Sequence, residues 1–333
     1  MKKKNKTIII AEAGVNHNGS LKLAKKMVIN ASKAGADYIK FQIFVPESLS
    51  TAFAEKPHYV KNIKNKSQLE MLKKLKLNEK DLFYLKKYCV KHNIKFLVSV
   101  FDEESLIIFK KLKLNLLKIP SGEINNIPLL QSIGKLKKKV ILSTGMSSLK
   151  EINDAIKILV SYGLKKKQIS ILQCTTEYPA PFTDLNLKVI HLFKKRFKLR
   201  VGFSDHSLGI EASIAAVSMG AEIIEKHFTL SKSFKGPDHK ASLTVKELTQ
   251  LVKSIRNLEK AFGIGKKYLT HTEKKNIKIV RKSIVAKKNI LQGEYFTTNN
   301  ITTKRPAIGK SPNIWSKVLG KKAKKDYLKD QLI

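Results

Sequence analysis

Eight short runs of apolar, often β-branched residues recur between residues 7 and 228, and longer stretches with helical spacing separate them. Most runs are continuously apolar, which is typical of strands covered on both faces. Eight strand–helix alternations predict an α/β fold, a closed (β/α)8 barrel of the TIM type. The rival fold, a doubly wound open sheet, more often has about five or six strands. The expected strands are residues 7–14, 37–44, 94–101, 114–122, 138–145, 169–176, 200–205 and 221–228.

Capping residues mark the ends of several expected helices. Ser20 is the expected N-cap of a helix that stops near Gly35. Ser148 is followed three residues later by Glu151, which is the spacing of a capping box. Another helix ends at Gly220. These signals place helices between the strands, as a barrel requires.

The chain changes character after the expected barrel. Residues 245–263 have the spacing of one long helix, and we expect the barrel domain, with this helix, to cover residues 1–262. A basic linker is expected over residues 263–280. Residues 281–333 contain short strand-like runs and the turn "QGE", which predicts a small strand-rich module. A module of that size buries little surface by itself, so we expect it to pack on something.

The net charge of +40 invites a nucleic-acid-binding interpretation. Only five of the 66 basic residues are Arg, the residue that nucleic-acid readers favour for bidentate contacts. The lysines are spread along the chain, and no motif of stacking aromatics accompanies them. We therefore interpret the charge as a solvated surface that attracts anionic substrates from a distance.

The cysteine content and the absence of a long apolar run favour a cytoplasmic protein. The two cysteines, Cys89 and Cys174, lie in different segments and suggest no disulfide framework. Cys174 is interpreted as a small buried apolar residue rather than a nucleophile. No stretch approaches the roughly 20 apolar residues of a membrane span.

Polar and charged residues stand at the end of each expected strand. The C-terminal ends of barrel strands converge on one site, so we expect these side chains to meet there. They are Glu12, Lys40, Gln42, Ser99, Lys118, Ser121, Ser143, Thr176, Ser204, His206, Glu225 and His227.

Three kinds of chemistry are open to this set. His206 and His227 end the seventh and eighth strands, which are neighbours, so both imidazoles can meet one metal ion. Lys40 or Lys118 could form a Schiff base or bind an anion. Serines followed by glycine, such as Ser121, suit a phosphate group, although ordinary turns also use them.

Ten short motifs are spaced along the chain: "AEAGVNHNGS", "KFQ", "SQLEM", "KIPSGEINN", "ILSTGM", "CTTEYPAPF", "GFSDHSLG", "EKHFTL", "GPDHKASL" and "TTKRP". They occur in the order in which the sialic acid synthase family has them, and the match spans nearly the whole chain. The chain thus resembles the bacterial N-acetylneuraminate synthases and their legionaminate and pseudaminate relatives. Its C-terminal module resembles the antifreeze-like (SAF) domain of that family.

The resemblance implies a metal-dependent condensation of phosphoenolpyruvate with an N-acylated mannosamine-type sugar. A divalent cation, Mn²⁺ or Mg²⁺, would be held by His206 and His227 and would polarise the open-chain sugar aldehyde. C3 of phosphoenolpyruvate would attack the aldehyde carbon, water would add at C2, and phosphate would leave with C–O cleavage. The expected product is N-acetylneuraminate from N-acetylmannosamine; the alternative is legionaminate from 2,4-diacetamido-2,4,6-trideoxymannose.

The resemblance also implies roles for the remaining site residues. Glu12 and Glu225 are the acid–base candidates, and the division between them stays open. Arg305 would reach the N-acyl end of the sugar across a domain-swapped homodimer. Phosphoenolpyruvate would be surrounded by Lys40, Ser99, Lys118, Ser121, Ser143, Thr176 and Ser204, and the sugar would be bound by Gln42, Tyr178 and Asp238.

This sequence departs from the family pattern at several places. The segment "VSVFD" replaces the common "STPFD", so Ser99 supplies the hydroxyl where relatives have Thr. Thr176 stands where several relatives have Asn, and Ala307 replaces the glycine of "KRPG". Asn62 and Asn65 both compete for the asparagine that the family has before "SQLEM".

Two rival functions follow from the same residues. A Schiff-base aldolase on the same barrel would use Lys118 or Lys40 with pyruvate, but it gives the two histidines no role. A nucleic-acid-binding protein would show steeply salt-dependent duplex binding, which dispersed lysines do not favour.

Overall fold

The computed structural model describes residues 6–55 and 67–333. The chain divides into two compact units, Met1–Phe262 and Gly263–Ile333. The two asparagines considered above, Asn62 and Asn65, lie outside the described residues.

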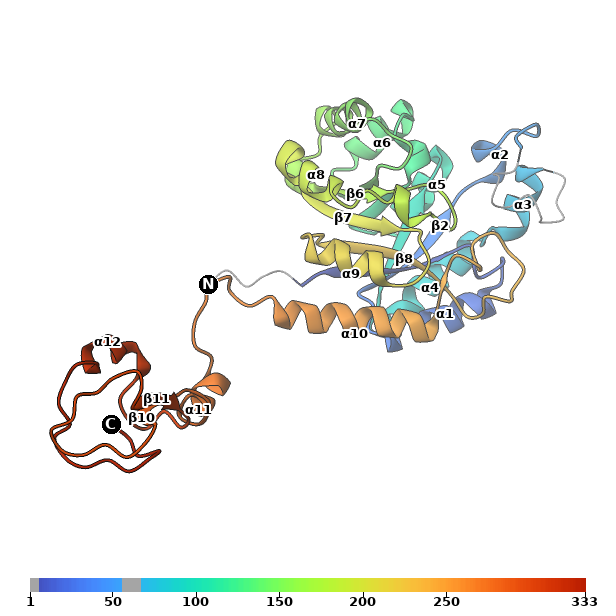
Figure 1. The fold of residues 1–333 in the computed structure, drawn as a ribbon. Helices are drawn as coiled ribbons and strands as arrows, with labels where there is room; N and C mark the ends of the chain where they lie inside the picture. Colours follow the sequence, from blue (N-terminus) through green and yellow to red (C-terminus); the bar gives the residue numbers. More distant parts are fainter. Residues whose placement is uncertain (1–5, 56–66) are drawn as a thin grey trace. The chain divides into compact units, whose positions relative to one another are not determined.

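The first unit is built on a closed parallel barrel (Figure 1). Each strand pairs with the next one in the sequence, and β1 also pairs with β8. A short additional strand, β9 (Leu243–Thr244), pairs in parallel with the end of β8. The predicted eight-stranded barrel is therefore confirmed. Its strands are β1 (Ile8–Gly14), β2 (Tyr38–Ile43), β3 (Lys95–Val100), β4 (Leu116–Ile119), β5 (Lys139–Ser143), β6 (Ile169–Cys174), β7 (Arg200–Asp205) and β8 (Ile223–Thr229).

Helices connect the strands and cover the outside of the barrel (Figure 1). The small helices α2 and α3 lie in the long connection between β2 and β3, and α10 follows β9. The helices of this unit are α1 (Leu21–Lys33), α2 (Pro46–Leu49), α3 (Gln68–Leu75), α4 (Glu79–Lys91), α5 (Glu103–Lys111), α6 (Ile127–Lys135), α7 (Leu149–Ser161), α8 (Val189–Phe197), α9 (Glu211–Ser218) and α10 (Val245–Ala261).

The predicted caps begin their helices. The Ser20 hydroxyl accepts a hydrogen bond from the Leu23 N–H at the start of α1. Ser148 and Glu151 form a reciprocal capping box at the start of α7. Each cap satisfies backbone donors that the first turn of a helix leaves unpaired.

The interior of the barrel is filled by a layer of aliphatic side chains. Ile10, Leu97, Ile141, Leu172 and Ile223 form a buried cluster there. Gly202 belongs to the same level, since a Cβ on it would lie 2.4 Å from the Ile223 carbonyl oxygen. This layer closes the barrel below the C-terminal ends of the strands.

The strand register brings charged residues from neighbouring strands to one level. Glu12 on β1 is level with Lys40 on β2 and with His227 on β8. Ser204 on β7 is level with Glu225 on β8. Side chains of alternate residues point to the same face of a strand, so these residues share one end of the barrel interior.

The second unit has its own small core around the antiparallel strands β10 (Ser283–Ala286) and β11 (Ile301–Lys304). Isolated bridges such as Ile290–Tyr327 hold the rest, so the module contains less regular strand than its sequence predicts. The expected linker, residues 263–280, groups with this unit and contains α11 (His271–Val280). The short helix α12 (Trp315–Val318) completes the unit.

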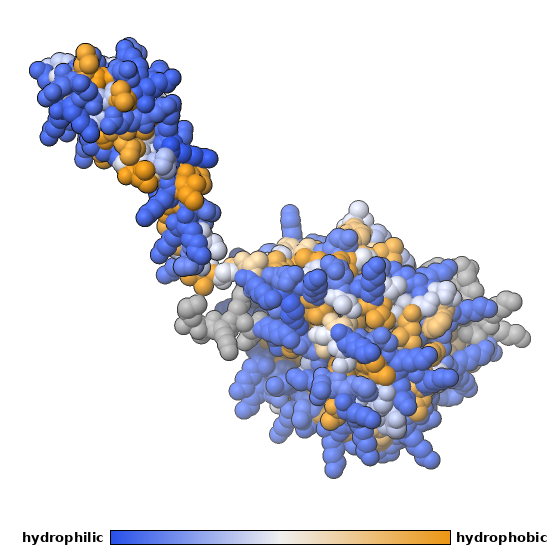
Figure 2. All heavy atoms as spheres, turned by 90° about the horizontal axis from the view of Figure 1, so that it is seen from below, coloured by the Kyte–Doolittle hydropathy of each residue, from blue (hydrophilic) through white to orange (hydrophobic). Residues whose placement is uncertain are grey.

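Hydrophilic side chains cover most of the face shown in Figure 2, with apolar residues scattered among them. This distribution is typical of a solvated surface. Among the helices formed by the described residues, none combines the length and the apolar character that crossing a membrane requires.

Candidate active site

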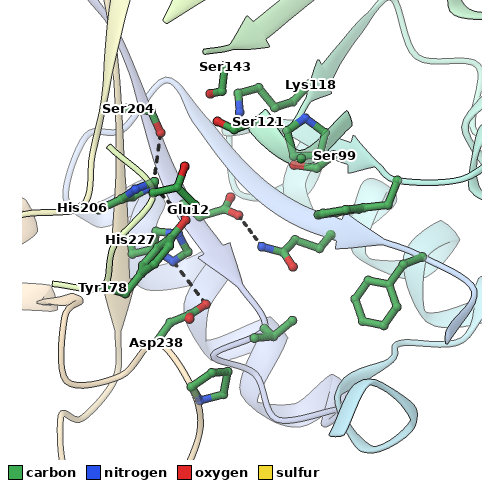
Figure 3. Close-up of a pocket in the computed structure, with 18 of the residues that line it drawn as sticks. Glu12, Ser99, Lys118, Ser121, Ser143, Tyr178, Ser204, His206, His227 and Asp238 are labelled. Carbon is green, nitrogen blue, oxygen red and sulfur yellow. Dashed lines mark hydrogen bonds and ion pairs between the residues drawn. The ribbon is translucent and has the colours of Figure 1, made fainter. Parts of the chain in front are cut away.

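A cavity of about 540 Å³ opens at the C-terminal ends of the barrel strands (Figure 3). All of the predicted site residues except Arg305 line it. They are Glu12, Lys40, Gln42, Ser99, Lys118, Ser121, Ser143, Thr176, Tyr178, Ser204, His206, Glu225, His227 and Asp238. The strand-end residues therefore lie together as expected, and Tyr178 and Asp238, which the resemblance implied, lie in the same cavity.

Two lysines and two glutamates are buried together at the base of the cavity. Lys40 Nζ lies 2.6 Å from Glu225 Oε2 and 3.6 Å from Glu12 Oε2. Lys118 Nζ lies 3.3 Å from Glu225 Oε1. All four side chains are at most 5% exposed. Burying four ionisable groups costs free energy even when they are paired. Their concentration in one cavity therefore indicates a site for charged ligands.

The electrostatic environment separates the two carboxyl groups. Burial raises the pKa of Glu12 to about 7, against the partial compensation that Lys40 provides. Burial also acts to raise the pKa of Glu225, but Lys118 and Lys40 outweigh it and hold that pKa well below its ordinary value. Near neutral pH one carboxyl group can hold a proton while the other stays ionised. That is the arrangement that acid–base catalysis requires.

The two lysines also differ. The pKa of Lys40 is raised, because the charges of Glu12 and Glu225 outweigh the effect of burial. The pKa of Lys118 is lowered, because burial exceeds the attraction of Glu225. Lys40 is therefore firmly cationic, which suits an anion-binding role better than a nucleophilic one.

Hydroxyl groups and a backbone N–H gather beside Lys118. The Gly145 N–H donates to Ser121 Oγ at 3.0 Å. A Cβ on Gly145 would lie 2.1 Å from Thr176 Oγ1 and 2.9 Å from Ser121 Oγ, so only glycine fits. Within the described part of the chain, the buried hydroxyl oxygens of Ser143 and Thr176 have no hydrogen-bond partner. Unpaired buried hydroxyls facing a cavity next to an ammonium group fit an oxyanion such as phosphate.

The two histidines lie together on the other side of the cavity, with their ring centroids 5.6 Å apart. His206 Nδ1 is 2.7 Å from the Thr175 carbonyl oxygen, which can only accept, so Nδ1 carries the proton. The lone pair is then on Nε2, which lies 3.1 Å from the Tyr178 hydroxyl. His227 Nδ1 is buried and, among the described residues, has no hydrogen-bond partner.

This pair fits a divalent cation. A backbone carbonyl that fixes the tautomer of one ring is the usual outer support of a metal-bound histidine. Burial lowers the pKa of His227 well below its ordinary value, so that ring is neutral. Burial acts in the same direction on His206, but Cys174 and the Thr175 carbonyl outweigh it and raise that pKa. Within residues 6–55 and 67–333, no group of three or more His, Cys, Asp or Glu side chains is arranged to hold a metal. The described part of the chain thus offers the cation two imidazoles and no further cluster of these four residue types.

The loop after β8 brings Asp238 to the histidines. Asp238 Oδ2 lies 3.6 Å from His227 Nδ1 (Figure 3), and burial raises the pKa of Asp238 to about 6. Its backbone carbonyl accepts a hydrogen bond from the Ser242 hydroxyl, which in turn accepts one from Asn16 after β1. The loops after the first and last barrel strands are thus tied together beside the site.

One side of the cavity is apolar. We call this surface the apolar wall. It joins the mouth of the barrel to α2 and α3, and two of its rings, Phe44 and Phe101, meet edge to face. The apolar wall consists of Val15, Phe44, Leu49, Met71, Leu72, Leu75 and Phe101.

Glu123 and Cys174 are among the further cavity residues that were not predicted as site residues from the sequence. Glu123 follows Ser121 and Gly122 in a short 3-10 turn, and burial raises its pKa. Cys174 ends β6 with Sγ 3.8 Å from His206 Nδ1, so it is a cavity residue and not merely a core residue. The motif "SGE" is the only sequence signal that could have placed Glu123 in the cavity. Cys174 could have been predicted there because it ends a strand.

Arg305 belongs to the second unit, where its side chain is exposed. Its loop is fixed to that unit, because Ser283 Oγ donates to the Pro306 carbonyl and the Ala307 N–H donates to the Lys278 carbonyl. Ala307 therefore occupies an anchored position.

Comparison with known proteins gives matches over nearly the whole chain. A model described as the NeuB family matches residues 27–267, and a SAF domain model matches residues 281–333. The N,N'-diacetyllegionaminic acid synthase of Campylobacter jejuni is 52% identical over 98% of this chain and 99% of its own length. The enzyme of that name from Legionella pneumophila is 42% identical, over 94% of this chain and 89% of its own.

A solved structure shows the same architecture. The N-acetylneuraminic acid synthetase of Leptospira borgpetersenii, in complex with citrate, is 36% identical and superposes with a TM-score of 0.72. The match covers 82% of this chain and 90% of that one.

Proposed function

Because this chain belongs to the NeuB family and ends in a SAF domain, we propose that it condenses phosphoenolpyruvate with an N-acylated mannosamine-type sugar, releasing phosphate. The observation that carries the proposal is one cavity in which buried lysines and unpaired hydroxyls lie opposite two imidazoles. An enol phosphate and an aldehyde need these two kinds of environment side by side.

Phosphoenolpyruvate would occupy the lysine side. Lys40 and Lys118 would each face an anionic group, and the hydroxyls of Ser121, Ser143 and Thr176 would donate to phosphate oxygens. The Glu225 carboxylate lies 2.6 Å from Lys40 Nζ and 3.3 Å from Lys118 Nζ, so a substrate anion would share both ammonium groups with it.

The sugar aldehyde would lie on the histidine side, with His206 and His227 as protein ligands of Mn²⁺ or Mg²⁺. The bound cation would supply Lewis acidity to the aldehyde oxygen. Asp238, Tyr178 and Gln42 would hold and orient the sugar hydroxyls, since all three line the same cavity.

Glu12 is the better candidate for proton transfer. A carboxyl group with a pKa of about 7 can donate to the forming hydroxyl and accept from the attacking water near neutral pH. Ionised Glu225 would instead keep both lysines charged and aligned. These roles divide the work between the two carboxyl groups that the sequence left undivided.

For the sugar, we prefer 2,4-diacetamido-2,4,6-trideoxymannose, which gives N,N'-diacetyllegionaminate, over N-acetylmannosamine. The relative with 52% identity carries that name. The apolar wall supports the choice, because methyl groups of acetamido and deoxy positions can pack on it, whereas sugar hydroxyls would lose their water partners there. N-acetylmannosamine, which the sequence alone favours, becomes the second candidate.

The test is phosphate release from phosphoenolpyruvate with each sugar in turn and Mn²⁺ present. We expect kcat/KM to be highest with the diacetamido sugar, lower with N-acetylmannosamine and lowest with its 6-phosphate. Equal rates of phosphate release with and without a chelator would contradict a metal-dependent reaction. Borohydride trapping of a lysine with pyruvate would point instead to a Schiff-base aldolase.

We also propose a homodimer in which Arg305 of one subunit serves the cavity of the other. In a domain-swapped dimer, the exposed Arg305 would have a role in the cavity of the partner subunit. Its loop is anchored to the second unit, which would hold the side chain in place for that role. Mixing two inactive variants, Arg305→Ala and His206→Ala, after subunit exchange should restore part of the activity. No restoration in a verified mixed dimer would rule out action across the interface.

A further inference from the structure

A buried ion pair lies directly behind the two histidines. Lys226 Nζ is 2.9 Å from Asp205 Oδ2, and the two side chains are 1% and 0% exposed. Asp205 is the last residue of β7 and directly precedes His206, and Lys226 precedes His227 within β8. Because successive side chains alternate between faces, the ion pair points away from the cavity while both imidazoles point into it.

His206 needs support because it lies just beyond the end of its strand. β7 ends at Asp205, so the strand ladder does not fix the next residue. Lys226 Nζ also donates to the Ser207 carbonyl oxygen at 2.6 Å. Asp205 Oδ1 accepts from the Ser207 N–H at 2.9 Å and from its hydroxyl at 2.6 Å. The residues on both sides of His206 are thus held by the ammonium group next to His227.

The same carboxylate is anchored to a helix. Ser213 Oγ, on α9, donates to Asp205 Oδ2 at 2.6 Å. The carboxylate and the ammonium group therefore have several short partners each, which compensates their burial and restricts their movement. A well-packed apolar pair would stabilise a barrel at least as well as a buried ion pair, so stability alone does not account for these residues.

We propose that Lys226 and Asp205 are positioning residues that set the separation and orientation of the His206 and His227 imidazoles for one divalent cation. The proposal rests on the metal-dependent function proposed above. Neither side chain lines the cavity, so neither can contact substrate or the cation directly. Their effect is therefore indirect: it passes through the backbone of residues 205–207 and 226–227, and the charge of Lys226 also acts on His227 through space.

The test is a Mn²⁺ titration followed by electron paramagnetic resonance, on the full chain without substrate. Lys226→Met keeps the length of the side chain and removes the charge. We expect it to raise the Kd for Mn²⁺ about tenfold, while circular dichroism shows a folded barrel. The matched control is Leu130→Ala in α6, a fully buried position remote from the histidines. Leu130→Ala should lower the melting temperature, but its Kd for Mn²⁺ should stay within about twofold of the wild-type value.

The outcomes separate the two proposals. If His206→Ala loses Mn²⁺ binding and Lys226→Met binds as tightly as the wild type, the positioning role is overturned and the metal site stands. If the wild type and His206→Ala bind Mn²⁺ equally, the metal site and the positioning role both fail. Should Lys226→Met not fold, Ser213→Ala decides: it removes one bond to Asp205, and we expect about threefold weaker binding. Unchanged affinity in Ser213→Ala would then overturn the proposal.

Discussion

At the scale of single residues, Gly145 shows how closely the lysine side of the cavity is packed. Its backbone N–H donates to Ser121, and the space where a side chain would begin is taken by the Thr176 and Ser121 hydroxyls. Without a Cβ the backbone can approach the two hydroxyl groups closely enough for this hydrogen bond to form.

Gly145→Ala is expected to lower the free energy of unfolding by about 1–3 kcal/mol, because the new methyl group overlaps Thr176 Oγ1. The double variant Gly145→Ala/Thr176→Ala should recover part of that loss, since it removes the overlapping atom. Urea denaturation of both variants and of Thr176→Ala measures the coupling. Strictly additive changes would show that the two residues do not clash.

The pH dependence of stability should reveal Glu12. Its pKa of about 7 in the folded chain exceeds the ordinary value of 4.5, so between these values the folded chain binds the proton more tightly than the unfolded chain does. The free energy of unfolding must therefore fall as pH rises from 4.5 to 7, relative to Glu12→Gln, which cannot ionise. Denaturant titrations of both proteins across this range give the difference. A flat difference would mean that Glu12 titrates as an ordinary carboxyl group.

The strand-end rule found the polar side chains of the cavity because parallel strands deliver their last residues to one edge. It could not find Glu123, which the chain reaches only after a 3-10 turn beyond β4. It also could not assign roles to Glu12 and Glu225. Their pKa values depend on which lysine lies nearest in space, and sequence spacing does not contain that distance.

At the scale of elements, the strands and the capped helices were predictable, and the small helices between β2 and β3 were not. Continuous apolar runs identify buried strands, and β1 to β8 fall inside the predicted ranges with one-residue exceptions at most. The helices α2 and α3 have no such pattern, yet they carry part of the apolar wall. Helix α11 was expected as part of a basic linker, and in the structure none of its residues is buried.

The capping box of α7 gives a prediction at this scale. Ser148→Ala should lower the free energy of unfolding by about 1 kcal/mol, because the Glu151 N–H loses its acceptor. Activity should not change, since Ser148 does not line the cavity. Ser161→Ala, near the other end of the same helix, is the control and should stay within about 0.5 kcal/mol of the wild type. Equal losses from both changes would argue against a specific contribution from the cap.

At the scale of the whole molecule, the net charge of +40 surrounds a cavity whose proposed first substrate is an anion. A field of one sign raises the rate at which oppositely charged ligands arrive, and salt screens it. The lysines on the surface can thus matter for catalysis without contacting the substrate.

We expect kcat/KM for phosphoenolpyruvate to fall roughly threefold or more as ionic strength rises from about 0.01 M to about 0.15 M. The same parameter for the uncharged sugar, measured at saturating phosphoenolpyruvate, should change little. Steady-state phosphate release at several salt concentrations tests this. A sugar dependence as steep as the phosphoenolpyruvate dependence would indicate a general effect of salt on the protein instead.

The pairing of β1 with β8 has a consequence for how activity arises during synthesis. Glu12 is contributed by the first strand and His227 by the last, and they become neighbours only when the ring is joined. A nascent chain can complete seven strands and still lack a complete active site. Turnover should therefore begin only after a ribosome has released the segment beyond β8, and enzymatic activity would report directly on closure of the barrel seam.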